Sequence, residues 1–123
     1  QKELYPSKLV DETNFESMFV ENDMHWHTSP WSKLYKRCII EEFHLRFSEG
    51  MHIGEDAVFL YTYILCSNKI YISDDTDYCY FAYTSGSLTK RINSLTSEVF
   101  AYNQIREIVE SLILKKVIKR IIS

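Results

Sequence analysis

Glycine, proline and cysteine are scarce in this 123-residue sequence, and two of these scarcities exclude kinds of site. The glycines are too few and too scattered for a glycine-rich phosphate-binding loop: Gly50, Gly54 and Gly86. The cysteines are odd in number and widely spaced, which fits neither a disulfide framework nor a zinc ribbon: Cys38, Cys66 and Cys79. We therefore expect a protein of a reducing compartment whose thiols lie in the core.

An excess of positive charge and a long hydrophobic run are also missing. The formal net charge is −3, so no summed positive field would attract nucleic acid. The longest apolar run, Ala57 to Cys66, is far shorter than the roughly 20 residues that a membrane-spanning helix needs. We expect a cytoplasmic protein that is soluble or, at most, peripheral at the inner face of the membrane.

The residues that are present favour a single globular domain over 1–123. Hydrophobic residues make up 46% and charged residues 25%, which is typical of a protein with a packed core. Aromatic residues reach 15%, a content that suits a core, a sugar-stacking surface or an interface equally well.

Two helices are predicted in the middle of the chain. Ser29 and Pro30 form a helix start, followed by an apolar stripe of Trp31, Leu34, Tyr35, Cys38 and Ile39. After a loop over residues 50–54, Glu55 and Asp56 open a helix that continues to Cys66. This second helix is apolar on nearly every side, so we expect it to be buried all round.

The remaining elements complete an α+β fold with three to four helices and a short β-hairpin. We expect a polar lead-in over residues 1–10, a short helix over 11–22, and strands over 69–73 and 78–83 joined by a turn. A long amphipathic helix is predicted from Ser94 almost to the end of the chain.

Three segments, in this order and at this spacing, carry a resemblance to a known family. They are Trp31-Ser32-Lys33-Leu34-Tyr35-Lys36-Arg37; then residues 45–50 with Gly54-Glu55-Asp56 and Phe59; then Tyr78-Cys79-Tyr80 with Gly86-Ser87-Leu88-Thr89. Together they closely resemble the acceptor-side, carboxy-terminal half of family-two glycosyltransferases of the GT-A fold. The resemblance covers about residues 29–91, and its specificity comes from the order of motifs that are each weak alone.

The resemblance implies an inverting transfer of a sugar from a nucleoside-diphosphate donor to a hydroxyl of a glycan or a lipid-linked glycan. It places the catalytic base on Asp56, with Glu55 before it, and substrate contacts on Trp31, Lys33, Arg37 and Gly54. In-line attack at the anomeric carbon needs a carboxylate within hydrogen-bond reach of the acceptor oxygen. The alternative is a non-catalytic carbohydrate-binding or scaffolding module with the same fold, in which the two acids only stabilise a helix start.

One part of the family pattern is missing. Similar proteins place a nucleotide-binding half, ending in an Asp-x-Asp metal motif, before the tryptophan helix. Asp75-Thr76-Asp77 spells this motif but follows Glu55-Asp56, in a predicted turn. We therefore expect Mn²⁺ or Mg²⁺ to be bound by a half that is absent from this chain, no metal within it, and no activity from this chain alone. A sequence that begins with Gln1 rather than Met agrees with a fragment.

Several residues have two interpretations at this point. Trp31 lines the acceptor site or belongs to the core, and Lys33 and Arg37 contact a phosphate or an acidic acceptor or lie on a solvated helix face. Two opposing effects act on the pKa of Asp56: the helix start lowers it, whereas Glu55 and burial raise it. His52 touches substrate or is a simple loop residue.

The basic end of the last helix is also open to two interpretations. Its cations are Lys115, Lys116, Lys119 and Arg120. A basic amphipathic helix lies on an anionic membrane, or it packs against the missing half or another subunit. The continuing apolar stripe favours packing. A pair of histidines, His25 and His27, has no third metal ligand in view.

Overall fold

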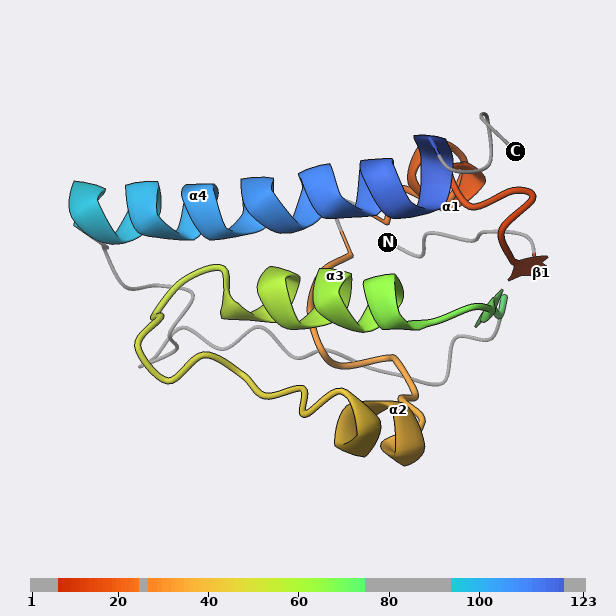
Figure 1. Cartoon of the computed structure of the whole chain (residues 1–123), viewed down its shortest axis with the longest axis horizontal. Coiled ribbons are helices and arrows are strands. Elements are labelled where there is room, and N and C mark those ends of the chain that lie inside the picture. The colour runs from red at the N-terminus through yellow and green to blue at the C-terminus, as the bar shows by residue number, and fades with distance from the viewer. Residues whose placement is uncertain (1–6, 25–26, 75–93, 119–123) are drawn as a thin grey trace.

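Figure 1 shows the computed structural model, which describes residues 7–24, 27–74 and 94–118. Their elements, in chain order, are β1 (Lys8–Val10), α1 (Ser17–Val20), α2 (Arg37–Glu42), α3 (Glu55–Cys66), β2 (Ile70–Ile72) and α4 (Leu95–Leu112), which continues as the π-helix η2 (Ile113–Ile118). In this part of the chain the fold is a small α+β arrangement of four α-helices and a two-stranded antiparallel sheet.

Helix α3 lies at the centre and is covered on all sides, as its apolar sequence predicts. None of its residues is exposed, and six of them are fully buried: Ala57, Phe59, Leu60, Tyr61, Tyr63 and Ile64. Figure 1 shows α4 along one side of α3 and α2 on the opposite side. A helix with large apolar groups on every face is stable only when other elements remove every face from water.

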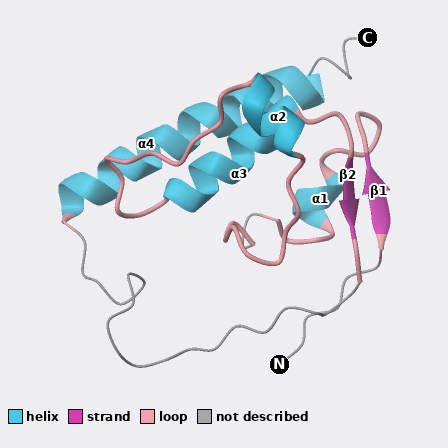
Figure 2. Cartoon of the chain, turned by 90° about the horizontal axis from the view of Figure 1, so that it is seen from below, coloured by secondary structure: helices cyan, strands magenta, loops and turns pink. Residues whose placement is uncertain are grey.

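Helix α4 confirms the long amphipathic helix predicted from Ser94. The Ser94 hydroxyl accepts a hydrogen bond from the backbone N–H of Ser97 at 3.2 Å, which caps the helix. Its core-facing stripe consists of Ala101, Ile105, Ile108, Val109 and Leu112. Figures 1 and 2 show α3 and α4 side by side, and the colour gradient of Figure 1 shows that they run in the same direction. Both helix starts therefore lie at one end of the pair.

The sheet differs from the expected hairpin. Strand β2 pairs antiparallel with β1, with Val10 opposite Ile70 and Lys8 opposite Ile72. The prediction of a polar lead-in was therefore wrong for residues 8–10, because the buried Val10 anchors this segment to the core, and three residues are too few to show a strand period. The other expected strand, residues 78–83, lies outside the described residues.

The helix predicted from Ser29 begins only at Arg37. Ser32 has a left-handed backbone (φ 60°), and Lys36 is extended (φ −70°, ψ 120°), with its N–H donating to the Tyr63 hydroxyl at 2.8 Å. Contacts with α3 thus replace the helical hydrogen bonds that the stripe indicated. In consequence Leu34 is fully exposed and Cys38 is exposed, so the prediction of a core thiol was wrong for Cys38.

The helix predicted over residues 11–22 is reduced to α1. The Asp11 carboxylate accepts hydrogen bonds from the N–H and hydroxyl of Thr13, at 2.8 and 2.6 Å, and the Asp11 N–H donates to the Asn14 side chain. Such local side-chain hydrogen bonds favour turns over helix, which explains the late helix start.

Gly54 joins the loop to α3 and touches α4. It has a left-handed backbone (φ 80°), and a Cβ atom there would lie 3.2 Å from both Ala101 Cβ and Ile105 Cδ1. The sequence analysis assigned Gly54 a contact with substrate, whereas the structure packs it against α4. A side chain at position 54 would therefore meet both a strained backbone conformation and crowding by α4.

We expect Gly54→Ala to lower the free energy of unfolding by about 1–3 kcal/mol. Thermal and urea unfolding measure this loss. Gly50→Ala is the matched control, because a Cβ at Gly50 meets nothing within 4 Å. Equal stability of the two variants would contradict the role assigned to Gly54.

Candidate functional site

The start of α3 holds the two acids that the sequence singled out. Gly54 is the N-cap residue but offers no side chain to cap the helix, and its carbonyl accepts from the Val58 N–H at 3.1 Å. The helix start therefore lacks a side-chain cap, and Glu55 and Asp56 occupy its first turn. Negative side chains are favourable there because the unpaired N–H groups carry partial positive charge.

Asp56 lies on the face of α3 that meets residues 33–36. Phe59 and Tyr63 follow it at three and seven positions, on the same side of the helix. Tyr35 packs edge-on against both rings, with centroid distances of 5.5 Å to Phe59 and 4.9 Å to Tyr63. This packing brings Lys33 and Tyr35 within electrostatic range of Asp56.

The surroundings of Asp56 in the fold determine whether its pKa is raised or lowered. Burial raises the pKa, and the neighbouring Glu55 carboxylate raises it further, while Lys33 lowers it. The balance is a raised pKa. A carboxylate with a raised pKa holds a proton more strongly, which suits a general base.

Lys33 is half-buried and does not lie on a helix. Its ammonium donates to the Ser29 carbonyl oxygen at 2.6 Å. Burial lowers the pKa of Lys33, and the charge of Asp56 opposes this by raising it. The expectation of a solvated helix face is therefore wrong for this residue, which lies outside any helix and within electrostatic range of Asp56 at the start of α3.

The contacts described for Arg37 and Gly54, two other predicted substrate residues, do not involve Asp56. Arg37, at the start of α2, forms an exposed ion pair with Glu41, 2.7 Å between Nε and Oε1. Trp31 is 40% exposed, so the alternative of a core tryptophan is wrong. Gly54 faces α4, as described above.

Tyr35 was missed as a site residue because the sequence placed it in a helical stripe. Its hydroxyl is buried and has no hydrogen-bond partner among the described residues. Burial raises the pKa of Tyr35, and Asp56 and Tyr63 raise it further. Lys33 and Tyr35 both interact with Asp56 although they are two positions apart, a spacing at which residues of one helix do not share a face, so the helical pattern of the sequence did not indicate this pair.

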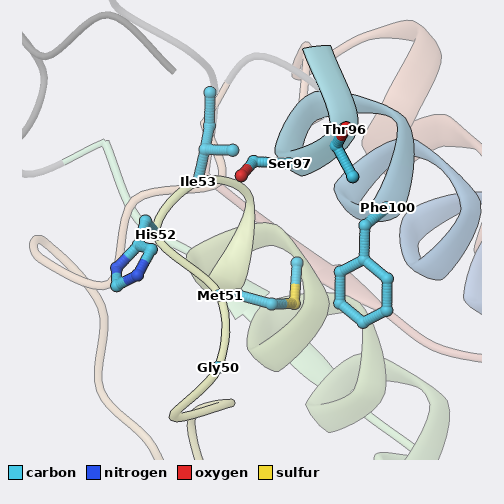
Figure 3. Close-up of a pocket in the computed structure, with 7 residues that line it drawn as sticks. All are labelled: Gly50, Met51, His52, Ile53, Thr96, Ser97 and Phe100. Atoms are coloured by element: carbon cyan, nitrogen blue, oxygen red, sulfur yellow. The ribbon is translucent and has the colours of Figure 1, made fainter. Parts of the chain in front are cut away.

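A pocket of about 300 Å³ lies at the same end of α3, between residues 50–53 and the first turns of α4. Figure 3 shows its lining: Gly50, Met51, His52, Ile53, Thr96, Ser97 and Phe100. Only His52 was singled out from the sequence. The residues of α4 lie more than 40 positions away along the chain, and only the packing of α4 on α3 brings them here.

A second cavity, of about 700 Å³, lies at the opposite end of α3 and is lined in part by Ser67, Lys69, Lys115 and Lys116. Lys116 donates to the Ser67 carbonyl just beyond α3. Cations near helix C-termini offset the partial negative charge of unpaired carbonyls, so Lys116 stabilises the end of α3. Lys119 and Arg120 lie outside the described residues.

Cys66, near the same end, has a pKa that burial raises, against the opposing effect of Lys115 and Lys116. A thiol with a raised pKa is a poor nucleophile.

In residues 7–24, 27–74 and 94–118, no group of three or more His, Cys, Asp or Glu side chains is arranged to hold a metal ion. His25 and the Asp75-Thr76-Asp77 sequence lie outside these ranges. None of the helices described is long and apolar enough to cross a membrane.

Comparisons with protein-family models, curated proteins and solved structures find no match for this chain.

The electrostatics of Asp56 can be tested by two substitutions with opposite effects. Lys33→Met removes the charge that lowers the pKa of Asp56, so we expect that pKa to rise. Glu55→Gln removes a charge that raises it, so we expect it to fall. Carbon-13 NMR of the Asp56 carboxyl during a pH titration measures both shifts. Shifts of the same sign would refute the arrangement.

The raised pKa also predicts a pH dependence of stability. A carboxyl with a higher pKa in the folded than in the unfolded state binds its proton more strongly when folded. The contribution of Asp56 to the free energy of unfolding is therefore present at low pH. It is lost as the pH rises from the ordinary pKa of 3.8 through the raised pKa of the folded state. We expect Asp56→Asn to remove this loss, so that the mutant gains Tm relative to wild type as pH rises. A constant Tm difference from pH 3 to 7 would be the contrary result.

Proposed function

We propose that this chain is the acceptor-side half of an inverting glycosyltransferase of the GT-A fold, with Asp56 as its general base. The observation that supports this best is the setting of Asp56. The carboxylate is half-buried in the first turn of a buried helix, with a pKa raised by burial and by Glu55, and with Lys33 and Tyr35 close by. The motif resemblance, from Trp31 through Glu55-Asp56, supplies the reaction type.

In the proposed reaction, an acceptor hydroxyl gives its proton to Asp56 while its oxygen attacks the anomeric carbon of the donor sugar. The new C–O bond forms on the face opposite the nucleotide. The bond from the anomeric carbon to the diphosphate oxygen breaks, and its electron pair leaves with the nucleoside diphosphate. One displacement with one base inverts the configuration at that carbon.

The structure suggests how neighbours prepare the carboxylate. Burial and Glu55 strengthen Asp56 as a proton acceptor, whereas the charge of Lys33 opposes them by lowering the pKa of Asp56. The Tyr35 hydroxyl, buried without a partner among the described residues, is a donor available on this face of α3. Gly54 fixes the helix start against α4, so Asp56 has a rigid support.

The proposal assigns the nucleotide-sugar donor and its Mn²⁺ or Mg²⁺ ion to a nucleotide-binding half outside residues 1–123. The described residues do not fit such an ion, because they contain no suitable group of three ligands. No step above runs through the metal. This chain alone is accordingly expected to be inactive.

A non-catalytic carbohydrate-binding module is the second candidate. The pocket beside the start of α3 favours it, because a half-exposed Phe100 and two hydroxyl side chains suit sugar binding without any chemistry. Loss of turnover on changing Asp56 separates the two candidates.

We expect Asp56→Asn to reduce sugar transfer by about a hundredfold or more, because the amide accepts no proton. The assay uses the full-length protein that contains this chain, with Mn²⁺ or Mg²⁺ and a panel of nucleotide sugars. Glu98→Gln is the matched control, since Glu98 is an exposed acid in the first turn of α4. Thermal unfolding shows that both variants are folded.

Equal turnover by wild type and Asp56→Asn would reduce Asp56 to a residue that stabilises a helix start. Glycan binding by the full-length protein without any turnover, across the donor panel, would favour the binding module.

A further inference from the structure

We propose that the pocket between residues 50–53 and the start of α4 binds one neutral sugar ring, the unit of the acceptor glycan next to the one that Asp56 activates. Its assignment to the acceptor rests on the proposed function. The binding of a sugar there rests only on the pocket itself, so the two can be tested separately.

The size and charge of the pocket define the class of ligand. Its volume of about 300 Å³ is at the lower end of the range for ligand pockets, which suits a single ring rather than a nucleotide. Its lining contains no Asp, Glu, Lys or Arg. An anionic group would find no counter-ion there, whereas a neutral polyol needs none.

The apolar part of the lining suits the C–H face of a pyranose. Phe100 is 50% exposed although it lies on a helix that packs against the core, and Met51 is buried. Figure 3 shows the Met51 side chain pointing toward the Phe100 ring. A sugar ring lying against Phe100 would remove this apolar surface from water.

The polar part of the lining can pair with sugar hydroxyls. Thr96 and Ser97 bring two hydroxyl groups from consecutive positions of α4. Ser97 Oγ lies 2.9 Å from Ser94 Oγ, a single hydrogen bond that leaves a hydroxyl with further capacity to donate or accept. The exposed His52 lies on the other side of the loop from α4, at the outer edge of the pocket (Figure 3).

The position of the pocket relative to Asp56 assigns it to a neighbouring sugar unit. Ile53, the last lining residue of the loop, precedes Asp56 by three residues, a span of at most about 11 Å. Asp56 is not part of the lining. Because Gly54 is packed against Ala101 and Ile105, the start of α3 that carries Asp56 is held against the helix that supplies Thr96, Ser97 and Phe100.

Saturation-transfer NMR on the 123-residue chain tests the pocket without any catalysis. The probes are methyl glycosides of glucose, galactose, N-acetylglucosamine and N-acetylgalactosamine, in both anomers, at about 10 mM, where weak binding is visible. We expect transfer from at least one glycoside. We expect Phe100→Ala to weaken it about tenfold. Tyr102→Ala is the matched control, because Tyr102 is an aromatic residue of the same helix, 66% exposed and outside the pocket.

Transfer that survives in Phe100→Ala, or falls equally in both variants, would overturn the inference, as would no transfer from any glycoside. Failure here is distinct from failure of the proposed function. If Asp56→Asn abolishes turnover and no glycoside binds, catalysis stands and the pocket is wrong. If binding depends on Phe100 and Asp56→Asn keeps full turnover, the pocket binds sugar and the general base is wrong.

Discussion

Helix α3 presents apolar side chains on every face, and the rest of the described structure is arranged to remove those faces from water. Helix α4 covers one side, while Tyr35 and the α2 region cover the side of Phe59 and Tyr63. Val10 from β1, Phe15 from the turn before α1 and Met18 from α1 close the core around Ile64. The apolar side chains that each segment buries against α3 offset the conformational entropy lost in ordering that segment. The short and irregular segments therefore become ordered by packing on α3.

The parallel packing of α3 and α4 separates the molecule into two chemically different ends. At one end, two helix starts lie together, with the acids Glu55 and Asp56 and a pocket without charged lining residues. At the other end, Lys115 and Lys116 lie beside the carbonyl groups that follow α3. This distribution agrees with the helix dipoles, which favour anions at starts and cations at ends. The contact that fixes the first end is Gly54 against Ala101, since any side chain there would separate the helices.

The setting of Asp56 shows how packing produces chemistry. A first-turn aspartate on an exposed helix is stabilised in its charged form by nearby N–H groups. Here, burial against residues 33–36 and the charge of Glu55 reverse that tendency and raise its pKa. The segment that causes the burial lies outside any helix, where Tyr35 packs on Tyr63 and the Lys36 N–H donates to the Tyr63 hydroxyl. A structural contact made for the core thus sets the proton affinity of the proposed base.

The sequence alone determined the features that depend on local pattern. These are the buried α3, its loop and Gly54, the long α4 that begins at about Ser94, and the two acids at a helix start, because periodicity and glycine conformation act within a few residues. Tertiary structure decided the late start of α2, the pairing of residues 8–10 with 70–72, the exposure of Trp31 and Leu34, and the pKa of Asp56. It also brought Thr96, Ser97 and Phe100 to the loop before α3. Each of these depends on contacts between residues far apart in the chain, whose free energy exceeds the small local preferences that a sequence displays.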